Sequence, residues 1–457
     1  MVTLNVMHRT YAQLLWPLDY AQAAPPLFLW IERWIYLHWG FGEDQLRLVS
    51  LLCGAASVGL FAWVVWRRFP APIAVAAAAI FAFCDKLIWH SDEVKQYSSD
   101  VFSALILIAL AIGLRRPVSS LRRLWLIALV SAVLLWFSFP VVFVYGPISL
   151  MLLVTIVRRV AWGQISLASA IFSCLAANVL VMASFILLYR ITVSGHAPYL
   201  DHYWREHFAD WSRWWTIPWW LISEVFSLCD HPYRSFGWLV LPMAATGAVA
   251  LYRSDRRDLL WVSIGPIGFN MIGAILGKYP FTGERITVFL VPGLFLLVAA
   301  ALDAAASRRA LRYLWIGLCL PFIVIGVGSA VPSLLHPRAR SGIRPVVEYI
   351  QKHRQPGEAI CMVGEGELPN AHFISGSSLE LLCYWPDAPG PLYGAPGTPP
   401  LRNIHQIKER RFWIVFAALP KHGSRNMEPL LADARSIASQ LDRNETPGGG
   451  AFLFEKR

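Results

Sequence analysis

Long apolar runs separated by short polar links fill the chain up to residue 332. Each run approaches, with its flanks, the roughly 20 residues that a membrane-spanning helix needs. We count ten such runs, at 46–66, 71–89, 98–114, 124–139, 141–157, 165–189, 235–252, 259–277, 288–303 and 312–331. The pattern predicts an α-helical polytopic membrane domain of about ten helices over 46–332. Pro140 leaves an alternative open, in which 124–157 is one kinked segment with a re-entrant piece.

The two ends of the chain depart from this pattern. Residues 1–45 mix aromatic and charged side chains around a Pro-Pro break, which predicts helices that lie in the membrane interface. From 333 onward the sequence predicts helix, turn and strand in GIRPVVEYIQKHRQPGEAICMVGEGE, a buried strand in RFWIVFAAL, an amphipathic helix in NMEPLLADARSIASQLDR and a closing strand in GAFLFEKR. We therefore expect a small soluble α/β domain over 333–457.

Composition agrees with a membrane protein, since 56% of residues are hydrophobic, 15% are charged and the mean hydropathy is +0.49. The net charge of +11 does not indicate nucleic acid, because the basic residues stand in short clusters at the ends of apolar runs. The seven cysteines show no CxxC or Cys/His metal spacing. Cys361 and Cys383 lie in the polar C-terminal part and would pair if that part faces an oxidising compartment.

The basic clusters also predict the orientation in the membrane. Arginines occur at every second link, as Arg67 and Arg68; Arg115, Arg116, Arg122 and Arg123; Arg158 and Arg159; Arg253, Arg256 and Arg257; and Arg308, Arg309 and Arg312. These links should be cytoplasmic by the positive-inside rule. The opposite face then carries residues 1–45, the link after residue 89, the loop 191–234, the link 278–287 and the C-terminal domain. The polar segments that could take part in function therefore lie on the non-cytoplasmic face.

The outer link HSDEVKQYSSD, residues 90–100, holds more charge than a connection between two spans needs. If the following helix begins near Asp92, then Glu93, Tyr97 and Asp100 fall at i, i+4 and i+7 on one stripe. Such a stripe at the membrane surface can hold a polar headgroup. The alternative is a solvated link with an ordinary helix cap.

The loop 191–234 contains six tryptophans between Asp201 and Trp220. Trp204, Trp211 and Trp215 repeat at helical spacing, which predicts an amphipathic helix at headgroup level. Anchoring in the interface is the simpler interpretation. In the alternative, some of these rings stack on a sugar while His202, His207 or Asp210 bonds its hydroxyl groups.

Four stretches taken together resemble bacterial GT-C glycosyltransferases of the family 39-like, dolichyl-phosphate-mannose-protein mannosyltransferase-like kind. They are YAQLLWPLDYAQAAPPLFLWIER, SDEVKQYSSD, KYPFTGERITVFLVP and IRPVVEYIQKHRQPGEAI. The resemblance covers nearly the whole chain and is specific as a combination. It implies a multi-pass enzyme of a bacterial inner membrane with a periplasmic or extracellular C-terminal domain. It also implies inverting transfer of a sugar from a polyprenyl-phosphate donor to an acceptor hydroxyl of a glycan, lipid or protein.

Such a transfer needs a cation at headgroup depth for the leaving phosphate and a base for the acceptor. Lys95 and Arg285 are our candidate cations, with Lys278 behind them, because each stands in an outer link beside a span end. Pairing with a neighbouring acid, or snorkelling to the interface, is the simpler alternative. We expect Tyr97 to bond phosphate or sugar and Asp100 to pair with a cation.

The sequence identifies the candidate base less directly than the candidate cations. Relatives carry an acidic pair, usually Asp-Glu, just before a stretch like TLNVMHRTYAQLL, whereas this chain begins at Met1 and lacks the pair. Either an upstream helix is missing, as an outer segment without signal peptide or preceding span also indicates, or the chain has lost its principal base. Glu93 is then the best remaining carboxylate, with Asp92 and Asp19 behind it. Asp92 and Glu93 are oxygen ligands that a divalent cation accepts, but the sequence shows no complete ligand set, so we assign no metal ligand.

Two other classes of function stay open. A transporter or flippase should carry charged residues near mid-span and a repeat between its halves. The sequence shows neither, since Asp85 and Lys86 lie near the outer end of their run. A catalytically impaired relative, whose soluble domain recruits an acceptor, is the other alternative.

Overall fold

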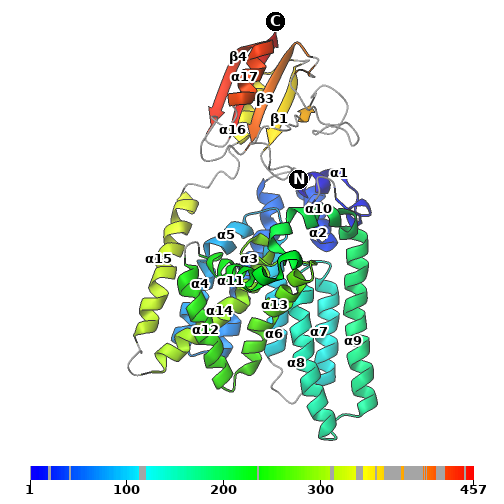
Figure 1. The fold of residues 1–457 in the computed structure, drawn as a ribbon, viewed down its shortest axis with the longest axis vertical. Helices are drawn as coiled ribbons and strands as arrows, with labels where there is room; N and C mark the ends of the chain where they lie inside the picture. Colours follow the sequence, from blue (N-terminus) through cyan, green and yellow to red (C-terminus); the bar gives the residue numbers. More distant parts are fainter. Residues whose placement is uncertain are drawn as a thin grey trace. The chain divides into compact units, whose positions relative to one another are not determined.

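The computed structural model describes residues 2–18, 22–40, 43–112, 120–233, 236–308, 313–335, 343–355, 358–364, 382–384, 405, 407, 409–417, 428–446 and 449–457. The chain divides into two compact units, Met1–Leu334 and Leu335–Arg457. Figure 1 shows that the first unit is built from helices and the second on a sheet.

Three short elements open the first unit, namely α1 (Val2–His8), η1 (Gln13–Leu15) and α2 (Pro26–Trp39). Proline suits the first position of α2, because the N–H that it lacks would have no partner there. Phe28, Leu29 and Ile35 of α2 are buried in a cluster with apolar residues of α1 and of the next helix. The segment that the sequence assigns to the interface thus folds as helices packed on the unit.

Each of the ten predicted apolar runs forms helix. The helices are α3 (Glu43–Arg68), α4 (Ala71–Ala82), α5 (Asp85–Ser91), α6 (Tyr97–Ile112), α7 (Ser120–Leu134), α8 (Val141–Ala161), α9 (Leu167–Leu188), α12 (Gly237–Arg253), α13 (Arg257–Ile275), α14 (Val291–Ala306) and α15 (Leu314–Leu335). Over the described ranges, five helical segments are long and apolar enough to cross a membrane, and the pair α4 and α5, bent by 53°, would make a sixth. The protein is a multi-pass membrane protein, and the predicted total of about ten spans stays a prediction.

Helices α7, α8 and α9 pack side by side, with α7 and α8 as separate helices on either side of Pro140 (Figure 1). Elsewhere, α12 packs closely on α14, because Gly247 has no side chain at their contact. A Cβ atom at Gly247 would lie 1.9 Å from the carbonyl oxygen of Leu297. Small residues of this kind let helices approach one another within a membrane.

Ion pairs join three of the five links that the sequence predicts to be cytoplasmic, those after α3, after α12 and after α14. Arg68 Nη2 lies 2.6 Å from Asp258 Oδ2, and Arg256 Nη2 lies 2.7 Å from Asp303 Oδ2. Arg256 also donates a hydrogen bond of 3.2 Å to the carbonyl oxygen of Arg68. These links therefore meet at one end of the helical unit, as a shared orientation requires. The side of the membrane that this end faces stays a prediction.

Short helices make up the long loop between α9 and α12. They are η3 (Tyr189–Val193, a π-helix), η4 (Ser194–His196), α10 (Ala197–Tyr203), η5 (Arg205–His207), η6 (Trp211–Thr216) and α11 (Ile217–Asp230), while η7 (Arg285–Leu290) leads into α14. The prediction of one amphipathic helix through Trp204, Trp211 and Trp215 is wrong. The Asp210 carboxylate accepts a hydrogen bond from the Ser212 backbone N–H at 3.0 Å and caps a new helical start at η6.

The link between α5 and α6 is not helical where the sequence predicts a helix. Residues 92–96 form turns, and α6 begins at Tyr97. The Glu93 carboxylate folds back on α5, where it accepts a hydrogen bond from the Trp89 indole at 3.2 Å and lies 3.1 Å from His90 Nδ1. The predicted stripe is therefore wrong, because these local bonds keep Glu93 off the helix that carries the other two residues of the stripe.

The second unit contains α16 (Ile343–His353), β1 (Ala359–Gly364), β2 (Leu382–Tyr384), β3 (Arg411–Ala417), α17 (Glu428–Ile437), β4 (Ala438–Thr446) and β5 (Gly449–Lys456). The strand order is β2-β1-β3-β5-β4, with β1 and β3 parallel and the other neighbours antiparallel. Phe412 and Ile414 of β3 pack with α17, whereas Trp413 and Val415 pack with α16. Burial on both faces explains the continuous apolar run of this strand.

One predicted element of this unit ends early. The helix expected over NMEPLLADARSIASQLDR stops at Ile437, and residues 438–446 form β4, which pairs with β5. Pairing with β5 gives this segment the backbone bonds that a helix would otherwise supply, so tertiary context overrides local helix propensity. In β1, Cys361 is disulfide-bonded, and the strand register places Cys383 of β2 opposite it.

Candidate functional site

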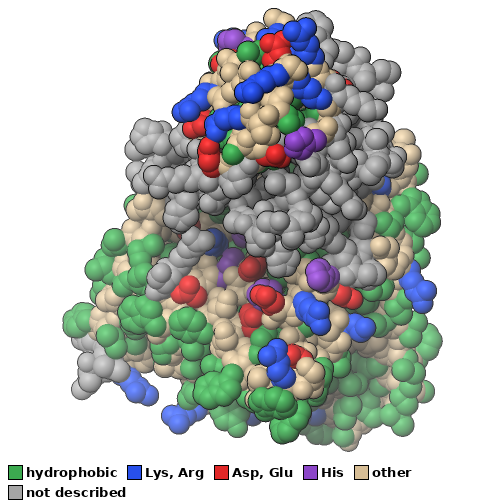
Figure 2. Space-filling view, turned by 45° about the horizontal axis from the view of Figure 1, so that its top comes forward, with side chains coloured by type: hydrophobic (Ala, Val, Ile, Leu, Met, Phe, Trp, Pro, Cys, Tyr) green, Lys and Arg blue, Asp and Glu red, His purple; other side chains and the backbone are tan. Residues whose placement is uncertain are grey.

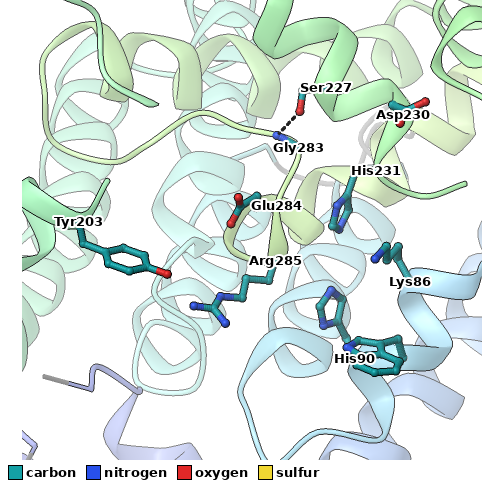
Figure 3. Close-up of a pocket in the computed structure, with 10 residues that line it drawn as sticks. Lys86, His90, Tyr203, Ser227, Asp230, His231, Gly283, Glu284 and Arg285 are labelled. Atoms are coloured by element: carbon teal, nitrogen blue, oxygen red, sulfur yellow. Dashed lines mark hydrogen bonds between the residues drawn. The ribbon is translucent and has the colours of Figure 1, made fainter. Parts of the chain in front are cut away.

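A cavity of about 430 Å³ lies among the predicted outer elements of the helical unit. Its volume falls in the range of roughly 300–1,000 Å³ that small-molecule sites occupy. Figure 3 shows its lining, which consists of Lys86, Trp89, His90, Tyr203, Ser227, Asp230, His231, Gly283, Glu284 and Arg285. These residues come from α5, α10, α11, the links that follow α11 and precede η7, and the first residue of η7, so only the fold brings them together.

Charged groups and imidazoles dominate the cavity. Arg285 extends into it from one side, and Lys86 lies across from it beside the imidazoles of His90 and His231 (Figure 3). The two imidazole rings are stacked, with centroids 6.0 Å apart and planes at 19°. In Figure 2, basic, acidic and histidine side chains gather on the forward end of the helical unit, above hydrophobic side chains. Two carboxylates, of Asp230 and Glu284, line the cavity with these two cations. The guanidinium and ammonium groups are the ones that can bind an anionic ligand such as a phosphate.

The position of Arg285 depends on a close approach between its link and α11. The backbone N–H of Gly283 donates to Ser227 Oγ at 3.2 Å (Figure 3). A Cβ atom at Gly283 would lie 2.1 Å from the Ser227 carbonyl oxygen, so a side chain does not fit there. Buried Thr287 donates to the carbonyl oxygen of Thr282 at 2.5 Å and closes the turn. These contacts fix Arg285 as the first residue of η7.

Two hydrogen bonds fix the opposite wall. Cys84, at the bend between α4 and α5, donates through Sγ to the Pro232 carbonyl oxygen at 3.3 Å. Tyr233 donates through its hydroxyl to the Ile80 carbonyl oxygen at 2.5 Å. Both bonds tie the bend to the turn after α11, and they bring the side chains of α5 up to His231.

The predicted cations are not brought together as a pair. Arg285 lines the cavity, but Lys95 is not among the lining residues. Lys95 Nζ donates instead to Gln22 Oε1 at 2.6 Å, in the segment before α2. Asp92 is also outside the lining and forms an ion pair of 3.1 Å with Arg47. Glu93 does not line the cavity, but its carboxylate lies 3.1 Å from Nδ1 of His90, which does.

The other predicted site residues lie in different surroundings. Tyr97 and Asp100 are buried at the start of α6, where Tyr97 packs edge-on against His90 with ring centroids 5.1 Å apart. Asp100 Oδ1 has no hydrogen-bond partner within the described ranges. Lys278 is exposed and does not line the cavity. Asp19 lies outside the described residues.

A second histidine–acid pair lies in the tryptophan-rich loop. His207 Nδ1 is 3.0 Å from Glu224 Oε1, and this hydrogen bond raises the pKa of His207. Hydrogen bonds from Ser212 and Arg213 hold the pKa of Asp210 at about 2. His207 and Asp210, two of the three residues that the sequence offers as sugar contacts, are thus engaged with neighbours of their own loop or of α11.

Sequence reasoning did not select Lys86, His90 or His231 for the site. Lys86 carries a local signal, since it is a charge near the outer end of an apolar run. His90 begins the outer link 90–100 that the sequence singles out, but nothing in its spacing from His231 indicates that the two rings stack. In the part of the chain that the structure describes, no group of three or more His, Cys, Asp or Glu side chains could hold a metal ion.

The fold is similar to two crystal structures of ArnT from Cupriavidus metallidurans. The structure bound to undecaprenyl phosphate has 13% sequence identity and a TM-score of 0.52, over 94% of this chain and 87% of that chain. The apo structure has the same identity and TM-score, over 98% of this chain and 92% of that one. No protein-family model and no curated protein sequence matches the chain. The protein shares the fold of these structures, so the predicted class of a helical polytopic protein with a small C-terminal α/β unit is confirmed.

Proposed function

We propose that this GT-C-fold protein is a membrane glycosyltransferase that passes a sugar from a polyprenyl-phosphate donor to an acceptor hydroxyl, with inversion. The observation that carries the proposal is the cavity in which Arg285 and Lys86, from distant parts of the sequence, face the same space. The ArnT structure bound to undecaprenyl phosphate, which shares the fold, supports a lipid-phosphate ligand.

The chemistry of the cavity suits this reaction. A polyprenyl-phosphate sugar keeps its tail in the lipid and its phosphate at the membrane surface. As the bond between the anomeric carbon and the phosphate oxygen breaks, negative charge builds on the phosphate. The Arg285 guanidinium and the Lys86 ammonium stabilise that charge more strongly in the transition state than in the ground state. Tyr203 and Ser227 supply hydroxyl groups in the same lining that can bond the sugar.

The other predicted residues take supporting roles in this proposal. Lys95 and Asp92 tie the turn between α5 and α6 to the N-terminal segment and to α3. Tyr97 packs against a cavity histidine. Asp100 and Lys278 keep their predicted places in or beside the outer links, but neither lines the cavity. Asp19 keeps its predicted place as a candidate acid of the first outer loop.

We further propose that the cavity opens to the outer face of a bacterial inner membrane and that the second unit is periplasmic or extracellular. The positive-inside rule supports this orientation, since three of the arginine-rich links meet at one end of the helical unit. The disulfide at Cys361 also supports it, because disulfides persist in oxidising compartments. A glycan, lipid or protein acceptor would approach from that side.

Binding of undecaprenyl phosphate to the full-length protein in lipid nanodiscs tests the proposal. Arg285→Gln and Lys86→Gln should each weaken binding about 10- to 100-fold, as expected for loss of a charged hydrogen bond of about 1.5–3 kcal/mol. Arg213→Gln and Lys352→Gln are the matched controls, because both side chains are exposed and neither lines the cavity. Equal affinity of the double variant and the parent protein would contradict the proposal.

Transfer itself is measured as release of undecaprenyl phosphate from radiolabelled undecaprenyl-phosphate hexoses in the presence of a membrane extract as acceptor source. Release above a control without protein is expected for at least one sugar of a panel of glucose, mannose and galactose donors. Tight binding without release from any of these donors would favour the catalytically impaired relative.

A further inference from the structure

His90 lines the cavity yet is enclosed by protein. Its side chain is 7% exposed, and its Nε2 finds no hydrogen-bond partner among the residues that the structure describes. A buried polar atom without a partner destabilises the fold, because its lost hydrogen bonds to water are not replaced. Retention of such an atom at the wall of a cavity therefore points to a ligand group that completes its bonding.

The contacts of Glu93 define the state of this imidazole. Glu93 Oε2 lies 3.1 Å from His90 Nδ1, and Oε1 accepts a hydrogen bond from the Trp89 indole N–H at 3.2 Å. An ionised carboxylate only accepts hydrogen bonds, so Nδ1 carries the hydrogen in this pair. In the neutral imidazole the free lone pair is then on Nε2, on the side of the ring away from Glu93.

We infer that His90 is the general base of the transfer and that Glu93 is its positioning residue; this inference rests on the proposed function. The acceptor O–H bond breaks, and its proton passes to His90 Nε2. The acceptor oxygen forms a bond to the anomeric carbon as the bond from that carbon to the phosphate oxygen breaks. The electron pair of the broken bond leaves with the polyprenyl phosphate between Arg285 and Lys86. Glu93 stabilises the imidazolium that forms.

The carboxylates in the lining are less suited to this role. Asp230 Oδ1 accepts a hydrogen bond of 2.8 Å from the backbone N–H of Gly237, so it holds the first residue of α12. Glu284 is exposed to solvent. The Nε2 atom of His90, in contrast, is shielded from bulk water, and this favours transfer to an acceptor hydroxyl over hydrolysis of the donor.

Charged and titratable groups face His90 from each element packed around it. They are Glu93 in its own link, Lys86 on α5, Tyr97 on α6, Asp230 and His231 at the end of α11, and Glu284 and Arg285 before and at the start of η7. The cations oppose an imidazolium at position 90, and the adjacent carboxylate favours it. Removal of the charge of Glu93 should therefore weaken the support for the imidazolium that forms during transfer.

The test is single-turnover release of undecaprenyl phosphate by the full-length protein in nanodiscs, from about pH 5.5 to about pH 8.5. His90→Gln should lower the rate about 100- to 10,000-fold, the usual contribution of general base catalysis, without weakening the binding of undecaprenyl phosphate. Glu93→Gln, which keeps the shape of the side chain but not its charge, should lower the rate without weakening the binding of undecaprenyl phosphate. Free imidazole should restore part of the rate to His90→Ala, which a merely structural role would not allow. His38→Gln, an exposed histidine on α2, should behave like the parent protein.

The outcomes separate this inference from the proposed function. A parent protein that releases undecaprenyl phosphate, with a His90→Gln variant of equal rate and unchanged pH profile, overturns the role of His90 and leaves the glycosyltransferase standing. A His90→Ala variant that binds undecaprenyl phosphate but is not rescued by imidazole also overturns it. A parent protein that neither binds nor releases the lipid overturns both.

Discussion

Glu32 on α2 provides a quantitative prediction about stability. Its side chain is fully buried, and neither carboxylate oxygen has a hydrogen-bond partner in the described part of the chain. Burial raises the pKa of Glu32 from 4.5 to about 8, because the low-dielectric surroundings disfavour the charged form. Glu32 is therefore mainly protonated at neutral pH in the folded protein.

The direction of the pH dependence follows from proton binding. The folded state holds the Glu32 proton more tightly than the unfolded chain does, so the free energy of unfolding falls as the pH rises from about 4.5 to about 8. Each pKa unit corresponds to about 1.4 kcal/mol, so the whole shift contributes about 5 kcal/mol to the free energy of unfolding in acid. Most of this contribution is already lost at neutral pH. Glu32→Gln cannot ionise and removes this dependence.

The assay is thermal unfolding of the parent protein and of Glu32→Gln in detergent micelles, followed by tryptophan fluorescence across this pH range. The difference in Tm, variant minus parent, should increase with pH. The buried amide adds a constant amount to this difference and does not change its dependence on pH. Glu206→Gln, at an exposed acid of the same unit, should show a constant difference. A difference for Glu32→Gln that stays constant from acid to neutral pH would refute the reasoning.

Two further predictions concern the surroundings of the cavity. Gly283→Ala should lower both Tm and affinity for undecaprenyl phosphate, because its Cβ atom would lie 2.1 Å from the Ser227 carbonyl oxygen. Gly268→Ala is the control, since no atom lies within 4 Å of a Cβ atom there. Equal losses of Tm and affinity in the two variants would contradict the close approach at Gly283. The bond to Glu224 raises the pKa of His207 above 6.5, so this pair stabilises the fold below that pH and loses its effect as the pH rises through the raised pKa. His207→Gln should therefore lower Tm more in acid than in alkaline buffer. A larger loss of Tm in alkaline buffer would contradict the predicted direction of the pH dependence.

Local patterns were sufficient for the membrane helices and for most of the second unit. An apolar run of span length folds as a helix whatever it packs against, because in lipid its backbone groups have no other partners. Arg285 could be selected in the same way, since a cation beside a span end marks the membrane surface. Local patterns failed where a side chain or a strand competed for the backbone, as Asp210 did at η6 and as β5 did for residues 438–446.

The sequence by itself therefore determined the class of the protein, the positions of its long apolar helices and the chemistry of its outer links. The tertiary structure decided which outer residues share a cavity. It turned Lys95 toward Gln22 and placed Lys86, His90 and His231 near Arg285. The reason is physical: helix periodicity depends on residues a few positions apart, whereas the cavity depends on the bend between α4 and α5 and on contacts between segments far apart in the chain.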